Sequence, residues 1–321
     1  MYGHGLRRLL YSGSVIALAA RANARTITVT NACSFTIWPA IFTDPTTNSA
    51  LPDTPTGWEA PPSTSVSFTV PDNWASGRIW GRSDCNFNTT TPGPNSCVTG
   101  GCNGGLECDK ATGTGVPPAT LAEWTLQASG NNDFYDVSLV DGFNLPLTIA
   151  PSSTECHTAS CPVNLNQVCP SDLAGPSNSS GVVEGCKSAC FANLDGNPSD
   201  SANCCSGSHG SAATCPPTGV AFYTYFKGNC PDAYAYPFDE GSGTALWTCS
   251  ATFNSDYTVT FCPTQERAVP SPTIPASAST TPVETEPFPT RGAAIPLAIP
   301  LHWCTPLLVA TLSAVLLLSS I

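Results

Sequence analysis

Residues 65–70 read Ser65-Val66-Ser67-Phe68-Thr69-Val70, a stretch in which hydroxyl side chains alternate with apolar ones. A period of two places the apolar side chains on one face of a strand and the polar ones on the other. Polar residues alternate with apolar or β-branched ones in three further stretches, residues 26–30, 134–140 and 257–261. Clusters of Pro, Gly, Asn and Asp separate these stretches, as turns do. The sequence therefore predicts a mainly β fold.

The cysteines divide this β protein into two parts. Of the 17 cysteines, 16 lie within residues 33–262, and nine of these lie within residues 156–230, where few strand patterns occur. An even number of cysteines in a secreted module indicates a disulfide framework, here of up to eight bridges. We expect a β core and a second, disulfide-rich lobe with one short helix at about residues 182–193. A cleft between two such lobes is a natural ligand site.

Spacing and charge exclude several classes of function. Cys102 and Cys108 are too far apart for a CxxC metal knuckle, and His157 and His209 stand alone, so we expect no metal and no cofactor. Residues 25–262 hold 20 acidic and six basic residues, a net charge of −14. Such a surface disfavours binding to nucleic acid, and anionic membranes repel it. We therefore expect contact with a membrane only through a lipid anchor.

The first 24 residues have the pattern of a secretory signal peptide. Arg7 and Arg8 precede an apolar stretch at residues 9–20 that is too short to span a bilayer, and Ala22-Asn23-Ala24 fits a cleavage site. The alternative is a buried N-terminal helix. With the signal removed, the folded domain is expected at residues 25–263.

The other end predicts a stalk and a lipid anchor. Residues 264–291 are rich in Pro, Ser and Thr, a composition that cannot bury enough surface to fold. Residues 292–321 consist of small residues that begin at Gly292, a spacer, and an apolar tail, the pattern of a GPI-attachment signal that is removed together with Cys304. A second possible attachment region is Ser277-Ala278-Ser279. The alternative is a single transmembrane helix, which needs about 20 apolar residues.

Two N-glycosylation acceptors follow from the secretory context. They are Asn88-Thr89-Thr90 and Asn178-Ser179-Ser180, and if used both must lie on the surface.

Five motifs together resemble the thaumatin-like proteins, the pathogenesis-related class that includes thaumatin and osmotin. They are Gly77-Arg78-Ile79-Trp80-Gly81-Arg82-Ser83-Asp84-Cys85, Thr120-Leu121-Ala122-Glu123-Trp124, Asp136-Val137-Ser138-Leu139-Val140-Asp141-Gly142-Phe143-Asn144-Leu145-Pro146, Cys230-Pro231-Asp232-Ala233-Tyr234 and Phe261-Cys262-Pro263. The resemblance covers residues 25–263 and all 16 cysteines of that region. It implies a flattened antiparallel β-sandwich with a disulfide-rich lobe, a small loop domain and an acidic cleft between domains.

The same resemblance implies the disulfide pairing, which spacing alone leaves open. The implied pairs are Cys33–Cys262, Cys85–Cys97, Cys102–Cys108, Cys156–Cys249, Cys161–Cys230, Cys169–Cys186, Cys190–Cys204 and Cys205–Cys215.

It also implies an acidic ligand-binding cleft. The family's one Arg, one Glu and three Asp correspond to Arg78, Glu123, Asp136, Asp141 and Asp239, with Glu240 as a rival for the last position. Crowded carboxylates accept hydrogen bonds from sugar hydroxyls, and their mutual repulsion can raise the pKa of one of them and leave a proton donor. Phe143 and Tyr234 are expected to line the cleft. A structural interpretation stays open, in which Arg78 only neutralises Glu123.

Three functions follow from these features. The first is an extracellular, antifungal or stress-response protein, expected to be monomeric, that binds β-1,3-glucan or a related wall component. The second is a weak endo-β-1,3-glucanase with Glu123 as the acid and Asp136 or Asp141 as its partner. The third is a cell-surface interaction module or enzyme inhibitor. No motif of a serine-hydrolase or Cys-His triad accompanies them.

Overall fold

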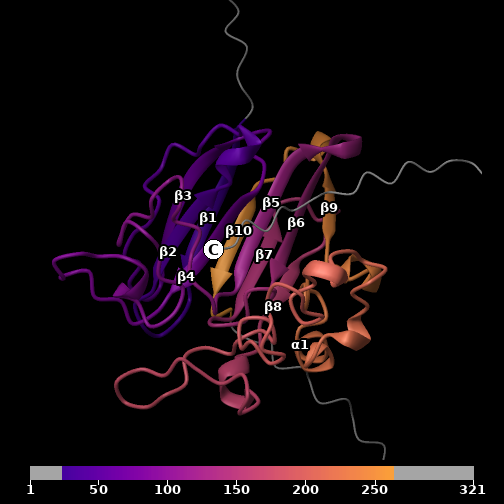
Figure 1. The fold of residues 1–321 in the computed structure, drawn as a ribbon. Helices are drawn as coiled ribbons and strands as arrows, with labels where there is room; N and C mark the ends of the chain where they lie inside the picture. Colours follow the sequence, from indigo (N-terminus) through magenta and orange to yellow (C-terminus); the bar gives the residue numbers. More distant parts are fainter. Residues whose placement is uncertain (1–23, 264–321) are drawn as a thin grey trace, which may run out of the picture. The chain divides into compact units, whose positions relative to one another are not determined.

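Two five-stranded β-sheets form the framework of the protein, which is described by a computed structural model for residues 24–263 (Figure 1). The first sheet has the order β3-β1-β10-β7-β8, and the second has the order β2-β4-β5-β6-β9. The first sheet consists of β3 (Thr64–Pro71), β1 (Ala24–Asn31), β10 (Tyr257–Phe261), β7 (Leu147–Pro151) and β8 (Ala159–Cys161). The second consists of β2 (Trp38–Thr43), β4 (Gly77–Arg82), β5 (Leu121–Ala128), β6 (Asn132–Ser138) and β9 (Trp247–Ser250).

The four stretches that predicted strands fall on β1, β3, β6 and β10, although β6 ends two residues before the predicted stretch does, and the mainly β prediction is confirmed. Neighbouring strands are antiparallel except for β1 and β10, which are parallel and adjacent. The first sheet is therefore mixed, and the second is wholly antiparallel. The expected signal peptide, stalk and GPI signal lie outside the described residues, apart from Ala24, the first residue of β1.

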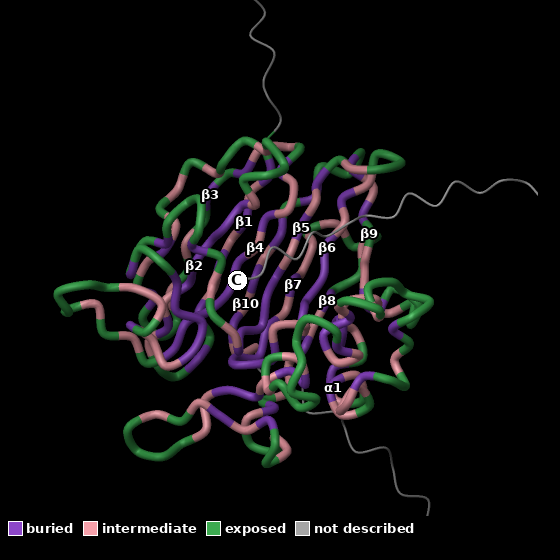
Figure 2. The backbone as a smooth tube through the Cα atoms, in the orientation of Figure 1, coloured by how far each residue is buried: buried purple, intermediate pink, exposed green. Residues whose placement is uncertain are grey.

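The main core lies between the inner faces of the two sheets (Figure 2). It combines Ile27 and Val29 of β1 with Val137 of β6 and Ile79 of β4, each at most 2% exposed. On each strand the intervening residues point away from this core, as a period of two requires. This alternation decides which side chains of β4, β5 and β6 are free to form a site.

Eight disulfides staple the described residues, and they are the eight pairs that the resemblance implied. The Cys33–Cys262 bridge joins residues 229 positions apart and connects the regions next to the ends of the parallel pair β1 and β10. Three short bridges lie wholly within residues 169–215 and hold together a region with little regular structure. This region matches the disulfide-rich lobe that the sequence predicts.

The short helix of that lobe is not where the sequence predicted it. Residues 182–193 form isolated bridges and turns, because Cys186 pairs with Phe143 and Ala174 and its backbone is already used. A Cβ on Gly185 would lie 2.4 Å from the Pro118 side chain, so the chain is tightly packed at this residue. The lobe's helix is instead α1, Tyr223–Asn229. No helix of the described region is long and apolar enough to span a bilayer.

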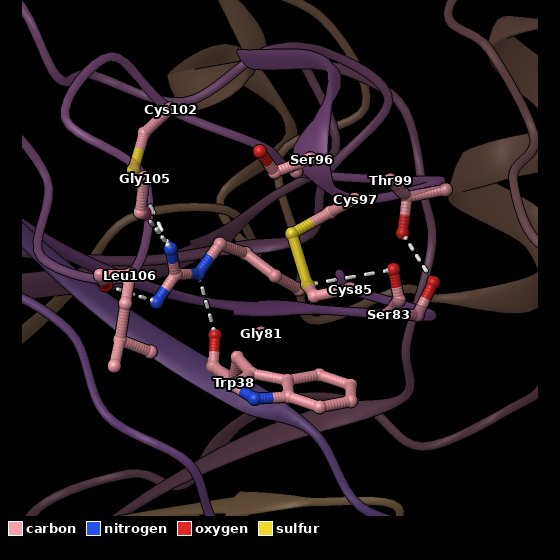
Figure 3. Close-up of a disulfide and its surroundings, with 12 residues drawn as sticks. Trp38, Gly81, Ser83, Cys85, Ser96, Cys97, Thr99, Cys102, Gly105 and Leu106 are labelled. Carbon is pink, nitrogen blue, oxygen red and sulfur yellow. Dashed lines mark hydrogen bonds between the residues drawn. A yellow bond between two sulfur atoms is a disulfide. The ribbon is translucent and has the colours of Figure 1, made fainter. Parts of the chain in front are cut away.

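A buried arginine organises the loop that follows β4. The Arg82 guanidinium donates to the carbonyl oxygens of Trp38, Pro39, Gly105 and Leu106, at 2.7 to 3.2 Å. Burial lowers its pKa to about 10. Figure 3 shows this region beside the Cys85–Cys97 disulfide, with the side chains of Ser83 and Thr99 in hydrogen-bonding contact. The loop region at residues 99–119 is thereby fixed against the outer face of the second sheet.

Candidate functional site

Arg78, Glu123 and Asp136 form a row across three adjacent strands. Arg78 of β4 is opposite Glu123 of β5, and Glu123 is opposite Asp136 of β6. Their sequence neighbours Ile79 and Val137 belong to the main core, so the row lies on the outer face of the second sheet. The pairing register thus brings together three residues that are up to 58 positions apart in the sequence.

Arg78 contacts the first carboxylate of the row. Its Nη2 lies 3.4 Å from Glu123 Oε1, and its Nη1 donates to Thr114 Oγ1 at 3.1 Å. Both charged side chains keep more than a fifth of their surface exposed. An ion pair with this exposure contributes about 0–1 kcal/mol to stability, so the pair orients Glu123 rather than stabilising the fold. Thr114, in the loop region at residues 99–119, is a contact that no sequence motif indicated.

Asp136 is the buried member of the row. Its residue surface is 9% exposed, and its Oδ1 atom has no hydrogen-bond partner. Burial raises the pKa of this carboxyl well above its ordinary value, the negative charge of Glu123 raises it further, and Arg78 opposes the rise. A carboxyl of this kind can stay protonated and donate a hydrogen bond where its neighbours only accept.

Asp141 joins the row electrostatically from the turn after β6. Its backbone oxygen accepts a hydrogen bond from the Ala119 N–H at 3.2 Å, which ties this turn to the loop region at residues 99–119. Burial raises the pKa of its carboxyl, Arg78 lowers it, and Glu123 raises it. We refer to Arg78, Glu123, Asp136 and Asp141 as the acidic cluster.

Asp239 lies in a different environment from the acidic cluster. It begins the 3₁₀ turn η7 (Asp239–Ser242) and is 1% exposed. Its carboxylate accepts from the hydroxyl of Tyr223 and the N–H of Ala235, and it lies 3.0 Å from Lys227 Nζ. Both carboxylate oxygens of Asp239 therefore have partners, and the contacts with Tyr223 and Lys227 hold η7 against α1. Glu240, the next residue, is exposed.

The two aromatic residues expected near the cleft have separate positions. Phe143 is wholly buried in the main core, so the expectation that it lines a ligand site is wrong. Tyr234 lies beside β6, where its N–H donates to the Val137 oxygen at 2.9 Å. It forms a parallel bridge with Ser138, two residues after Asp136. Burial raises the pKa of its hydroxyl, and the charge of Asp136 adds to the rise.

The two histidines of the cysteine-rich region differ in their surroundings. His157 stacks on Trp247 with a centroid separation of 3.6 Å, and His209 is half-buried, with its Nδ1 3.1 Å from the Thr214 oxygen. In the described residues, no group of three His, Cys, Asp or Glu is arranged to hold a metal ion.

The two glycosylation acceptors differ in their surroundings. Asn88 is exposed on the loop between Cys85 and Cys97. Asn178 is half-buried; its Nδ2 donates to Glu184 Oε1 at 2.8 Å, and its Oδ1 accepts from the N–H groups of Ser180 and Val182.

Comparison with known proteins identifies the class to which this fold and cluster belong. Residues 31–263 match the sequence profile of the Thaumatin family, and the chain belongs to that family. It is 43% identical over 260 residues to a pathogenesis-related thaumatin-like protein 3.5 of Cryptomeria japonica. The aligned region covers 80% of this chain and 98% of the relative.

Two further relatives differ in the activities that their names state. A glucan endo-1,3-beta-glucosidase of Prunus avium is 40% identical over 245 residues, covering 75% of this chain and 92% of that protein. The solved structure of a thaumatin-like xylanase inhibitor is 22% identical, with a TM-score of 0.37, and covers 74% of this chain and 99% of that one. At this TM-score the structural likeness carries no functional argument.

Proposed function

We propose that this protein is an extracellular defence protein that binds β-1,3-glucan or a related wall polysaccharide through its acidic cluster. The observation that carries the proposal is the buried Asp136 carboxyl with its unpartnered Oδ1, beside a Glu123 carboxylate oriented by Arg78. A protonated carboxyl donates a hydrogen bond and a carboxylate accepts one, so together they match the hydroxyl groups of a neutral sugar.

Co-sedimentation with insoluble β-1,3-glucan tests this proposal. Protein expressed from the full chain in a secretory host is mixed with the glucan, and cellulose serves as the control polysaccharide. E123Q removes the accepting carboxylate of Glu123, and D136N replaces the protonated carboxyl of Asp136 by an amide of similar shape, so each is expected to weaken binding. E155Q and D172N change exposed carboxylates outside the acidic cluster and are the matched controls. Unchanged binding in both E123Q and D136N overturns the proposal.

A second function, slow hydrolysis of β-1,3-glucan, is favoured by the opposed positions of Glu123 and Asp136. Their direct pairing on antiparallel strands places the two side chains next to each other on one face of the sheet, and a retaining glycosidase needs two neighbouring carboxyl groups about 5–5.5 Å apart. The raised pKa makes Asp136 the acid and leaves Glu123 as the nucleophile, the reverse of the roles expected from the sequence. The name of the Prunus avium relative is consistent with this function.

Release of reducing sugars from laminarin separates hydrolysis from binding. A hydrolase loses its turnover in both D136N and E123Q, whereas a pure binding protein shows the same background as buffer in every variant. Turnover that persists unchanged in D136N contradicts the assignment of Asp136 as the acid.

We also propose that the protein is held at the outer face of the plasma membrane by a GPI anchor. Eight disulfides fit an oxidising compartment. The support for the anchor itself is the pattern of residues 292–321. Treatment of intact cells with a phosphatidylinositol-specific phospholipase is expected to release the protein; retention on the cells favours a transmembrane helix.

A further inference from the structure

The outer face of the first sheet carries hydroxyl side chains on each of its five strands, which lie side by side in Figure 1. On β1, Ile27 and Val29 belong to the main core. The residues that alternate with them, Thr26, Thr28 and Thr30, therefore point outward. The acidic cluster lies on the outer face of the second sheet, so the main core separates the two surfaces.

The strand register aligns these hydroxyls in rows that cross the sheet. The longest row takes one residue from each strand, in the order Ser65, Thr30, Thr260, Thr148 and Ser160. The next row consists of Ser67, Thr28, Thr258 and Ala150, and a shorter third row consists of Thr69 and Thr26. Ten of these eleven side chains end in a hydroxyl. We refer to the eleven residues as the hydroxyl face.

The hydroxyl face is uncharged, although the domain is strongly acidic. Residues 25–262 hold 20 acidic and six basic residues, and none of them belongs to the face. The acids beside the face are at its margins. Asp256 Oδ1 accepts from the Thr26 N–H at 2.7 Å, and Asp232 forms an isolated bridge with Ser160. An uncharged surface with acids at its margins complements a neutral partner and disfavours an anionic one.

The hydroxyls of this face are both held in place and accessible. Thr28 Oγ1 lies 2.8 Å from Ser67 Oγ, and Thr30 Oγ1 lies 2.9 Å from Ser65 Oγ. Every residue of the face is half-buried or exposed. A hydroxyl has one donor and two acceptor positions, so a single cross-strand bond leaves it free to bond to a ligand as well. Thr is also stiff about χ1, so a ligand orders little that the sheet has not already ordered.

We propose that the hydroxyl face is a second polysaccharide-binding surface, which takes long uncharged chains whatever their glycosidic linkage. Sugar hydroxyls donate and accept as Ser and Thr hydroxyls do, and a row of short hydroxyls has no group that distinguishes one linkage from another. This surface goes beyond the proposed function and does not depend on the acidic cluster.

The strength of single hydrogen bonds makes the partner a polymer. Each contributes about 0.5–1.5 kcal/mol net, so one sugar binds weakly. The row across five strands is roughly 19 Å long, so a long chain makes several such contacts at once. Neighbouring strands of a sheet are twisted relative to one another, which curves the row. A flexible chain follows this curve better than the flat face of a crystal does.

Co-sedimentation of the full chain with amorphous cellulose tests the inference, because cellulose is neutral and lacks β-1,3 linkages. T28V/T30V/T258V/T260V removes four hydroxyls and keeps β-branched side chains that suit strands. It is expected to bind cellulose at least about tenfold more weakly than the wild type. The matched control T47V/T252V changes two exposed hydroxyls outside the face and is expected to bind as the wild type does. Wild-type binding is expected to be independent of salt, since the partner is uncharged.

Several results would overturn the inference. They are a wild type that does not bind cellulose, equal binding by the quadruple valine variant, and wild-type binding that weakens as salt is raised. If gel filtration shows a wild-type dimer that the valine variant loses, the face joins two copies of the chain, and the inference is also overturned. If the valine variant does not fold, T258K replaces it: Thr258 is half-buried in the second row, and a long charged side chain there is expected to weaken binding.

The outcomes separate this inference from the proposed function. E123Q and D136N leave the hydroxyl face intact, so both are expected to bind cellulose as the wild type does, while their binding to β-1,3-glucan is weaker. If the valine variant loses cellulose binding but E123Q and D136N keep all their β-1,3-glucan binding, the proposed function fails and the inference stands. If E123Q lowers glucan binding and the valines leave cellulose binding unchanged, the inference alone fails.

Discussion

Asp136 makes the stability of the folded domain depend on pH. Its pKa is raised in the folded state, so the folded protein binds this proton more tightly than the unfolded chain does. The stabilising effect of this proton is complete below the ordinary Asp pKa of about 3.9, and it is lost as the pH rises through the folded-state pKa. Ionisation of this buried side chain above its folded-state pKa is therefore a cost to the fold.

D136N is accordingly expected to be more stable than the wild type, and by a larger margin at pH 7 than at pH 4. An unpartnered buried acceptor costs roughly 1–3 kcal/mol, and the amide removes the charge that adds to this cost. Melting temperatures of the wild type and D136N, measured at both pH values, check the prediction. A difference in melting temperature that stays constant or shrinks as the pH rises would contradict it.

Among the charged side chains, Arg25 is the one whose substitution is expected to destabilise the domain most. It is 1% exposed; Nη1 donates to Asp133 Oδ2 at 2.9 Å and Nε contacts Asp72 at 3.2 Å. The Tyr257 hydroxyl completes the surroundings of Asp133. Replacing Arg25 by Met leaves the Asp133 carboxylate buried without its cation, a loss of about 3–5 kcal/mol.

Denaturant unfolding of R25M against R78Q measures this difference. Arg78 is the matched control, because its ion pair with Glu123 is partly exposed and contributes at most about 1 kcal/mol. R25K is also expected to be unstable, since lysine cannot contact Asp133, Asp72 and the Ala251 oxygen together. An R25M variant no less stable than R78Q would show that the buried network contributes little.

For single residues, the sequence predicts which charged side chains belong to the site better than it predicts their burial and partners. The motifs around Arg78, Glu123 and Asp136 were enough to nominate these residues by resemblance, and the strand register brings them together. Asp239 and Glu240 are adjacent and both acidic, so no motif distinguishes the buried from the exposed one. That distinction depends on contacts with α1, whose position the sequence did not indicate.

Of the eight disulfides, the one that closes the longest loop is expected to stabilise the fold most. In the loop-entropy account, a disulfide stabilises the fold by restricting the unfolded chain, and this stabilisation grows with loop length. It is about 5 kcal/mol for a separation of 229 residues and about 2 kcal/mol for six. The double variant C33S/C262S should therefore melt at a lower temperature than C102S/C108S. Calorimetry of both variants under non-reducing conditions checks this order; equal melting temperatures would contradict it.

The elements also show where sequence patterns are informative. Strands at residues 65–70 and 257–261 could be predicted because one face is buried against the core and the other is polar. Residues 182–193 could not be assigned in this way, since bridges to Phe143 and Ala174 take up the backbone groups that a helix would use. Such long-range pairing in a disulfide-rich region leaves no local period in the sequence.

For the whole molecule, the net charge of −14 over residues 25–262 predicts no attraction to anionic lipid. Only six basic residues are present in this range, and two of them, Arg25 and Arg82, are buried. Protein freed of any lipid anchor is expected to stay in the supernatant with vesicles that contain phosphatidylserine, at both low and physiological salt. Co-sedimentation that increases as salt is lowered would contradict this prediction.

The parallel contact between β1 and β10 has a consequence for synthesis. The first strand of the domain leaves the ribosome more than 200 residues before its neighbour, and β10 lies between β1 and β7. Until β10 arrives, the first sheet is two separate pieces, β3-β1 and β7-β8, with open edges that can pair with other chains. The nascent protein therefore exposes these edges until β10 has been made, and the Cys33–Cys262 bond can form only after that point.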